Sequence, residues 1–381
     1  MRRIAFLLLL TLGFAPQALA AKLVSVAELE QFLAASHGQS DARVARQLSG
    51  FELTERASSA RLAQWQAAFP GHRCHEAFTV LADASAILDL PAADIPAMPL
   101  PEHDELKAML RKTVDYLNTT ISRLPNFYAT RKTDYFEDTP PHATTEQFAS
   151  PAGRPRSAAG SPSVESSYLP MHSAGTSSVI VSYREGHEMR GSKRADDDSL
   201  SRLDGHLASR GEFGHILIVV LGNAIHNKIE WSHWEKDSSG VSAVFRYRVP
   251  QGQTNYMVLV PHRGGTEQTF PAFHGELAID PDDGSIVRVT VIADFYPPLE
   301  QVKSSILVEY ASVSIGGAPY ICPIKSVALA KMPVEGEQDF VMSYQTQLND
   351  VAFTNYHLFR SESRVLTGAD VTNDQAPPPP K

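Results

Sequence analysis

Cysteine, excess positive charge and long apolar runs are all scarce in this sequence. Its 381 residues include two cysteines, and acidic side chains outnumber lysine and arginine by 43 to 34. An acidic balance without a basic cluster gives no electrostatic basis for binding nucleic acid. After the first twenty residues, no apolar run approaches the roughly 18 to 20 residues of a transmembrane helix. We therefore expect neither a nucleic-acid-binding protein nor an integral membrane protein.

The two cysteines, Cys74 and Cys322, are far apart in the chain. In an oxidising compartment they could pair and close a very long loop. Their positions do not show whether the two Cα atoms approach within bonding distance. Two buried free thiols are the favoured interpretation, and pairing remains the alternative.

Linear catalytic motifs are also absent. The sequence contains no G-x-S-x-G, G-x-G-x-x-G or phosphate-binding loop. His72 and His75 lie at helical spacing beside Cys74, but a metal would need further ligands that no pattern supplies. A solvated helix end is favoured there, and we predict no metal and no cofactor. Carboxylates that could pair for hydrolysis need no motif, and no catalytic residue is selected; the candidates would be Glu235, Glu276, Asp294 and Glu309. The sequence favours a protein that is not an enzyme.

The first twenty residues have the pattern of a secretory signal. Arg2 and Arg3 precede a short apolar stretch, residues 4–14, and Ala18-Leu19-Ala20 is a small-x-small cleavage site. Cleavage after Ala20 is predicted, with a periplasmic or secreted mature chain. No cysteine stands directly after the cleavage point, where Ala21 follows, so a lipid anchor is not expected.

The remaining chain divides by composition. Residues 23–90 contain four short amphipathic segments with breaks between them, which predicts a small helical bundle. Residues 91–101 hold four prolines and are expected to form a stiff linker. Residues 102–360 are predicted to form an antiparallel-sheet domain, with a disordered insertion at 139–173. A disordered tail is expected at 361–381.

Within the second domain, two helices and a run of strands are expected. Residues 102–123 carry an apolar stripe, and residues 211–227 are apolar all round, which implies burial on most sides. The clearest strand pair spans 270–296, where the turn Asp280-Pro281-Asp282-Asp283-Gly284 joins two alternating segments. Further strands are predicted at about ten-residue spacing: 126–137, 177–183 with a continuation to 189, 228–235, 241–249, 255–260, 273–279, 286–293, 304–311, 320–329, 340–348 and 353–360. The expected fold class is α+β, a helical bundle followed by a long curved antiparallel meander with two packed helices.

Aromatic residues on these strands are the candidate binding residues. Period-two alternation places Trp231 and His233 on one face and Trp234 on the other. A curved sheet could offer its aromatic side chains to a hydrophobic guest. Ordinary core packing beneath the two helices is the favoured alternative for such residues. The candidate ligand-binding residues are Trp231, His233, Phe245, Tyr247, Tyr310 and Tyr344.

The helix–strand order of residues 102–137 and the run FHGELAIDPDDGSIVR at 273–288 resemble the LolA/LolB-like lipoprotein-carrier superfamily. The resemblance implies an open half-barrel with helices in its mouth and a periplasmic carrier that binds a hydrophobic or acyl ligand. No lipid-handling residue of that family maps to a position here. Residues 23–90, LPNF at 124–127 and WSHWE at 231–235 are also similar to secreted proteins of soil bacteria without an assigned activity. The alternative hypothesis is a structural or interaction protein of the cell envelope, with other envelope proteins as partners and no small-molecule ligand.

Overall fold

The computed structural model describes most of the chain between residues 21 and 359. The described residues are 21–120, 123–138, 169–190, 193–194, 207–224, 226–236, 240–262, 265–334 and 343–359. The expected signal peptide, most of the expected insertion at 139–173 and the expected tail at 361–381 lie outside them. In the described part the fold is α+β, with six α-helices and one large antiparallel sheet that is not closed.

Four helices and two very short strands make up residues 22–84. They are β1 (Lys22–Val24), α1 (Val26–Ala35), α2 (Asp41–Leu48), β2 (Phe51–Leu53), α3 (Ser59–Ala68) and α4 (His72–Ala84). Ser25 begins α1 in a capping box, because its hydroxyl accepts from Glu28 N and Glu28 Oε2 accepts from Ser25 N at 2.8 Å. Leu29, Leu48 and Phe78 are fully buried between the helices. The parallel pair β1–β2 was not expected, since three residues are too few to show alternation.

The proline-rich segment 91–101 contacts both the N-terminal helical part, residues 22–84, and the large sheet, whose strands lie within residues 127–358. It contains the short 3₁₀ helix η1 (Ala92–Asp94), and the Arg61 guanidinium of α3 donates to both oxygens of Asp94, at 2.8 and 2.6 Å. Further along, the indole of Trp234 donates to Pro99 O at 2.9 Å. Helix α5 (His103–Thr120) then follows.

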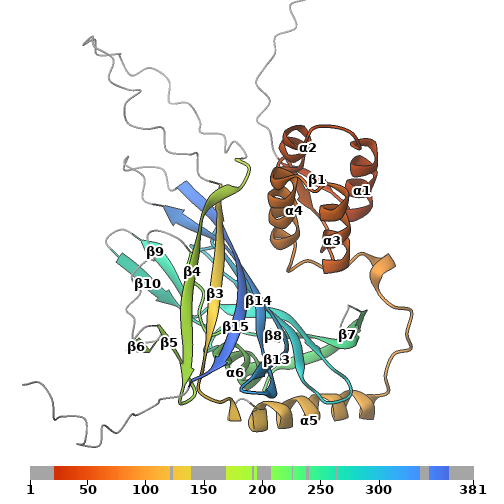
Figure 1. The fold of residues 1–381 in the computed structure, drawn as a ribbon. Coiled ribbons are helices and arrows are strands. Elements are labelled where there is room, and N and C mark those ends of the chain that lie inside the picture. The colour runs from red at the N-terminus through yellow and green to blue at the C-terminus, as the bar shows by residue number, and fades with distance from the viewer. Residues whose placement is uncertain are drawn as a thin grey trace, which may run out of the picture.

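The large sheet has the strand order β6-β5-β4-β3-β15-β14-β13-β12-β11-β8-β7 (Figure 1). Its strands are β3 (Phe127–Glu137), β4 (His172–Arg184), β5 (His187–Arg190), β6 (Lys193–Arg194), β7 (Lys228–Lys236), β8 (Val241–Val249), β11 (Ala272–Ile279), β12 (Ile286–Asp294), β13 (Lys303–Ile315), β14 (Ala318–Val334) and β15 (Ser343–Leu358). Every neighbouring pair is antiparallel. The last strand, β15, lies between β3 and β14, so the chain end joins two halves of the sheet.

Several predicted boundaries are wrong, each for a local reason. The strands predicted at 340–348 and 353–360 are one long strand, β15. The strand expected to continue to residue 189 turns at Glu185 and Gly186, both with positive φ, and β5 follows as a separate strand. The strand expected at 255–260 is β9 (Val258–His262), which pairs with β10 (Gly265–Thr269) in a separate hairpin. Helix α6 (His215–Ala224) is shorter than predicted, because the positive φ at Gly211 and Gly214 delays its start.

The hairpin β11–β12 is confirmed, and its turn is also a docking point. Asp280 O accepts from Gly284 N at 2.9 Å, and Gly284 has φ +78°. The ammonium of Lys112 on α5 donates to the carbonyls of Pro281 and Asp282, at 3.1 and 2.9 Å. A Cβ on Gly284 would lie 2.6 Å from Thr113 N, so glycine is needed for space as well as for φ.

The sheet has two different faces. The packed face carries apolar side chains from β8 and β11 to β14 and is covered by α5 and α6; among its residues are Phe245, Tyr247, Phe273, Leu277, Val289, Val291, Ile306 and Val308. The charged face is the opposite one, and it carries Arg246, Glu276, Arg288, Glu309, Lys325 and Asp350. Helices α1–α4 lie on the charged side, and α5 runs along the lower end of the sheet (Figure 1). No helix in the described ranges is long and apolar enough to cross a membrane.

Candidate functional site

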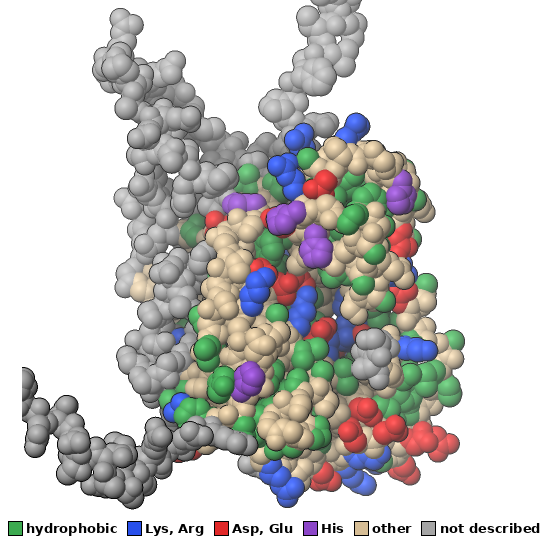
Figure 2. Space-filling view, viewed as in Figure 1, with side chains coloured by type: hydrophobic (Ala, Val, Ile, Leu, Met, Phe, Trp, Pro, Cys, Tyr) green, Lys and Arg blue, Asp and Glu red, His purple; other side chains and the backbone are tan. Residues whose placement is uncertain are grey.

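The charged face meets the N-terminal helices through a group of ion pairs centred on Arg288. Its guanidinium donates to both oxygens of Glu235, at 2.6 and 2.8 Å, and to Glu276 Oε2 at 3.2 Å. Arg56, from the N-terminal part, donates to Glu235 Oε2 at 2.7 Å. Arg246 completes the group, since it bonds Glu276 at 3.2 Å and forms an ion pair with Asp89. Charged side chains gather in this seam between the two parts of the molecule (Figure 2).

Strand register explains why these side chains meet. Directly opposed residues of antiparallel neighbours point to the same face, and Glu276 stands opposite Arg246 while Arg288 stands opposite Glu309. Period-two alternation then keeps all of them on one side of the sheet. The segment after α4 also contacts Arg56: the backbone N of Arg56 donates to Asp89 O at 2.8 Å.

Glu235 is the common counter-ion of two arginines. Burial by itself would raise the pKa of Glu235, but the imidazole of His233 and the guanidinium groups of Arg288 and Arg56 hold it well below its usual range. The carboxylate is therefore ionised at neutral pH and has no proton to donate. This arrangement fits a structural counter-ion better than a general acid.

A second ion group joins α4 to strand β14. The ammonium of Lys325 lies 2.7 Å from Asp83 Oδ1 and 3.5 Å from Asp350 Oδ1. Asp83 is buried, and both burial and the neighbouring charge of Asp350 raise the pKa of its carboxyl group. Beside it, Ala86 packs against Leu307 and Val327 of the charged face. The N-terminal part is thus fixed to the sheet by two ion groups and a small apolar contact.

The two parts also line an open cleft of about 1160 Å³. One wall is a stripe of α4 at helical spacing, Arg73, Glu76, Ala77, Val80, Leu81 and Ala84, supplemented by α2 and β2. The other wall is the charged face of β13 to β15, where Leu329, Val334 and Tyr344 are among the lining residues. The volume exceeds the ~300 to 1,000 Å³ of most small-molecule sites, and both walls offer apolar side chains.

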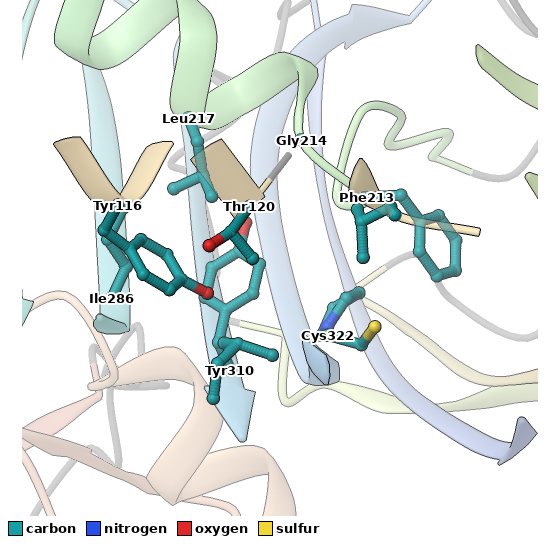
Figure 3. Close-up of a pocket in the computed structure, with 11 residues that line it drawn as sticks. Tyr116, Thr120, Phe213, Gly214, Leu217, Ile286, Tyr310 and Cys322 are labelled. Carbon is teal, nitrogen blue, oxygen red and sulfur yellow. The ribbon is translucent and has the colours of Figure 1, made fainter. Parts of the chain in front are cut away.

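A small cavity lies in the packed face, among described residues of α5, α6 and the sheet. It has a free volume of about 20 Å³, close to that of a single water-sized probe. Figure 3 shows Tyr116 and Thr120 reaching it from α5, Leu217 from α6, and Tyr310 and Cys322 from the sheet. Helices α5 and α6 therefore fill most of this face, as the core-packing alternative for the aromatic residues requires.

The structure distributes the six sequence-predicted binding residues over three places. Trp231, Phe245, Tyr247 and Tyr310 pack in the core of the packed face. The hydroxyl groups of Tyr247 and Tyr310 donate to the backbone carbonyls of Thr290 and Glu212. His233 lies on the charged face, 3.8 Å from Glu235, and Tyr344 lines the cleft.

The expected arrangement of the β7 aromatic residues is wrong. Register shifts by one residue between Trp231 and His233, so a β-bulge interrupts the alternation. Trp231 and Trp234 consequently share a face, with ring centroids 4.9 Å apart, and His233 points to the other.

The remaining candidates also have structural surroundings. Of the four carboxylates considered for hydrolysis, Glu235 and Glu276 share Arg288, and Asp294 accepts from or pairs with His274 at 3.0 Å. Cys74 and Cys322 are free and buried in separate cores, and burial raises the pKa of each thiol to about 12. Within the described ranges, no group of three His, Cys, Asp or Glu side chains is placed to hold a metal ion.

The cleft residues were missed at the sequence level because the two walls come from segments more than 200 residues apart. The exception is Tyr344, which is among the six predicted binding residues and lines the cleft. Comparisons with models of protein families, with curated proteins and with solved structures find no match to this chain. The functional argument therefore depends on the cleft itself.

Proposed function

We propose that this chain is an exported binding protein, periplasmic or secreted, that holds an apolar or acyl ligand in the cleft between α4 and strands β13 to β15. The supporting observation is a cleft of about 1160 Å³ with apolar side chains on both walls. In this proposal the signal at residues 1–20 directs export, α1–α4 act as a helical bundle, and the sheet is a LolA/LolB-like half-barrel. The ligand site differs from the one expected by resemblance, because α5 and α6 fill the packed face.

The walls of the cleft support a ligand rather than a simple gap between domains. Val80 on α4 and Leu329 and Val334 of β14 are partly exposed and line the same cleft. Apolar surface in contact with water is unfavourable. A ligand that covers it would contribute about 25 cal/mol of binding free energy for each Å² removed from water. A hydrophobic guest would remove that contact with water.

A loading experiment with a matched control tests the proposal. The mature chain, residues 21–381, would be purified, examined by native mass spectrometry for co-purified lipid, extracted, and titrated with a dansyl-labelled fatty acid. Val80→Trp places a large ring in the cleft beside the apolar wall and should weaken uptake, whereas Val179→Trp on the exposed surface of β4 should leave it unchanged. A protein that is empty as purified and takes up no probe would contradict the proposal.

A second candidate, an interaction protein of the cell envelope, is favoured by a different observation. The packed face is filled by the chain's own helices, and β4 exposes Val179 and Ile180, the latter at 69%. Isolated apolar residues on a strand are common at protein surfaces, but alternation points these two to opposite faces, so a partner that wraps around this stretch of β4 would contact both. Affinity capture from an envelope fraction should then recover a stoichiometric partner that Ile180→Asp no longer binds.

A further inference from the structure

Two lysines stand directly opposite each other on neighbouring strands at the cleft. Lys303 of β13 pairs in register with Lys331 of β14, and both line the cleft. Like charges in this arrangement repel and destabilise a sheet. Among the described residues, no carboxylate forms an ion pair with either ammonium group, and the centroid of the Tyr344 ring lies 5.9 Å from Lys331 Nζ.

Another lysine on the same strand shows the contrast. Lys325 points to the same face as Lys331, and Asp83 and Asp350 neutralise it at 2.7 and 3.5 Å. The chain thus supplies carboxylates to the lysine that holds the domains together. Neither Lys303 nor Lys331 has a carboxylate partner among the described residues.

The positive pair adjoins an apolar surface. Leu329 lies two residues before Lys331 on the same face, a separation of about 7 Å along a strand, and it also lines the cleft. The opposite wall contributes Val80, together with the cations Arg46 and Arg73 and the carboxylates Glu52 and Glu76. A ligand that satisfies both features has a negative head and a hydrocarbon body.

We propose that the cleft binds a single-chain amphiphile with a carboxylate head, the head held by Lys303 and Lys331 and the chain by the apolar walls. This inference rests on the proposed function and specifies its ligand class. The selective part is the pair of ammonium groups, because the apolar walls would accept charged and uncharged chains alike.

The test compares one probe in two charge states. Dansyl-undecanoic acid and its methyl ester would be titrated into the mature protein, into the double variant Lys303→Met with Lys331→Met, and into Lys107→Met, a control on the exposed surface of α5. Two partly exposed ion pairs correspond to a loss of about 3- to 30-fold in affinity for the acid. We expect that loss in the double variant only, with unchanged affinity for the ester, and weaker acid binding at high salt.

The outcomes distinguish a failure of the lysine proposal from a failure of the proposed binding function. Equal binding of acid and ester by the unaltered protein and the double variant would overturn the lysine proposal and leave the binding function intact. Failure of every variant to bind either probe would overturn both. Uptake only after deletion of residues 142–166 would assign the cleft to the chain itself and also overturn both; Asp138 and Leu169, the nearest described residues on either side, line the cleft. Thermal melts of each variant would show that binding is compared between folded proteins.

Discussion

Arg288 and Glu235 form a two-pronged ion pair although two strands lie between theirs. Arg288 is on β12 and Glu235 is on β7, with β11 and β8 in between. The row of paired residues that starts at Arg288 passes through Ala278 and Val244, whose side chains are short, and ends at His233, two residues before Glu235 on the same face. The two long side chains can therefore lie over them and meet, and Arg56 reaches the same carboxylate from the N-terminal part.

Glu235→Gln should destabilise the fold strongly. The substitution leaves Arg56 and Arg288 buried without a full counter-charge, which typically costs about 3 to 5 kcal/mol. Glu230→Gln is the matched control, because Glu230 lies on the same strand and pairs with Lys228 at the exposed surface; its effect should stay within about 1 kcal/mol. Chemical denaturation of both variants would measure the difference, and equal losses would contradict the role assigned to the buried pair.

The contribution of Glu235 should depend on pH in a defined direction. Its pKa in the folded protein lies below the usual value of 4.5, so its stabilising effect is complete above that value and is lost as the pH falls toward the folded pKa. The stability gap between the unaltered protein and Glu235→Gln should therefore be constant near neutrality and narrow below about pH 4.5. Denaturation curves at a series of pH values would show this, and a gap that widens on acidification would refute it.

Gly284→Ala should loosen α5. An alanine there meets the positive φ and also the backbone of Lys112 and Thr113, within 2.5 to 2.6 Å. Gly252→Ala is the control, since Gly252 has φ +86° with open space around it and should cost only the left-handed penalty of about 1 to 2 kcal/mol. The larger loss for Gly284→Ala should appear together with faster amide exchange across residues 103–120. Equal exchange in the two variants would count against the close approach.

Lys325→Met and Lys331→Met should behave differently although both lie on β14. Loss of Lys325 leaves Asp83 and Asp350 without their ammonium partner, which we expect to cost about 3 kcal/mol. Loss of Lys331 relieves repulsion with Lys303, so stability should change by no more than about 0.5 kcal/mol. Melting experiments on the two single variants would separate a structural lysine from a binding one. A large loss in Lys331→Met would remove the basis for treating that residue as part of a ligand site.

The features that sequence patterns predicted are those built from local signals. The turn at Asp280 to Gly284 identified the central hairpin, and the wholly apolar segment before Ala224 identified a buried helix. The register between neighbouring strands could not be predicted from such local signals. Counting from the Gly316–Gly317 turn places Lys303 opposite Ala330, and only the bulge at Glu309 and Tyr310 moves it opposite Lys331. The cleft and its lysine pair thus depend on a one-residue irregularity and on contacts between distant segments, neither of which leaves a periodic trace.

The position of β15 sets an order of events for the growing chain. Residues 343–358 occupy the place between β3 and β14, so among the described strands of the large sheet the group β3–β6 pairs with none of the others until residues 343–358 have been synthesised. Contacts of such long sequence separation are slow to form. A chain cut short before residue 343 would present two unjoined half-sheets with open edges, and these are the surfaces on which a polypeptide self-associates.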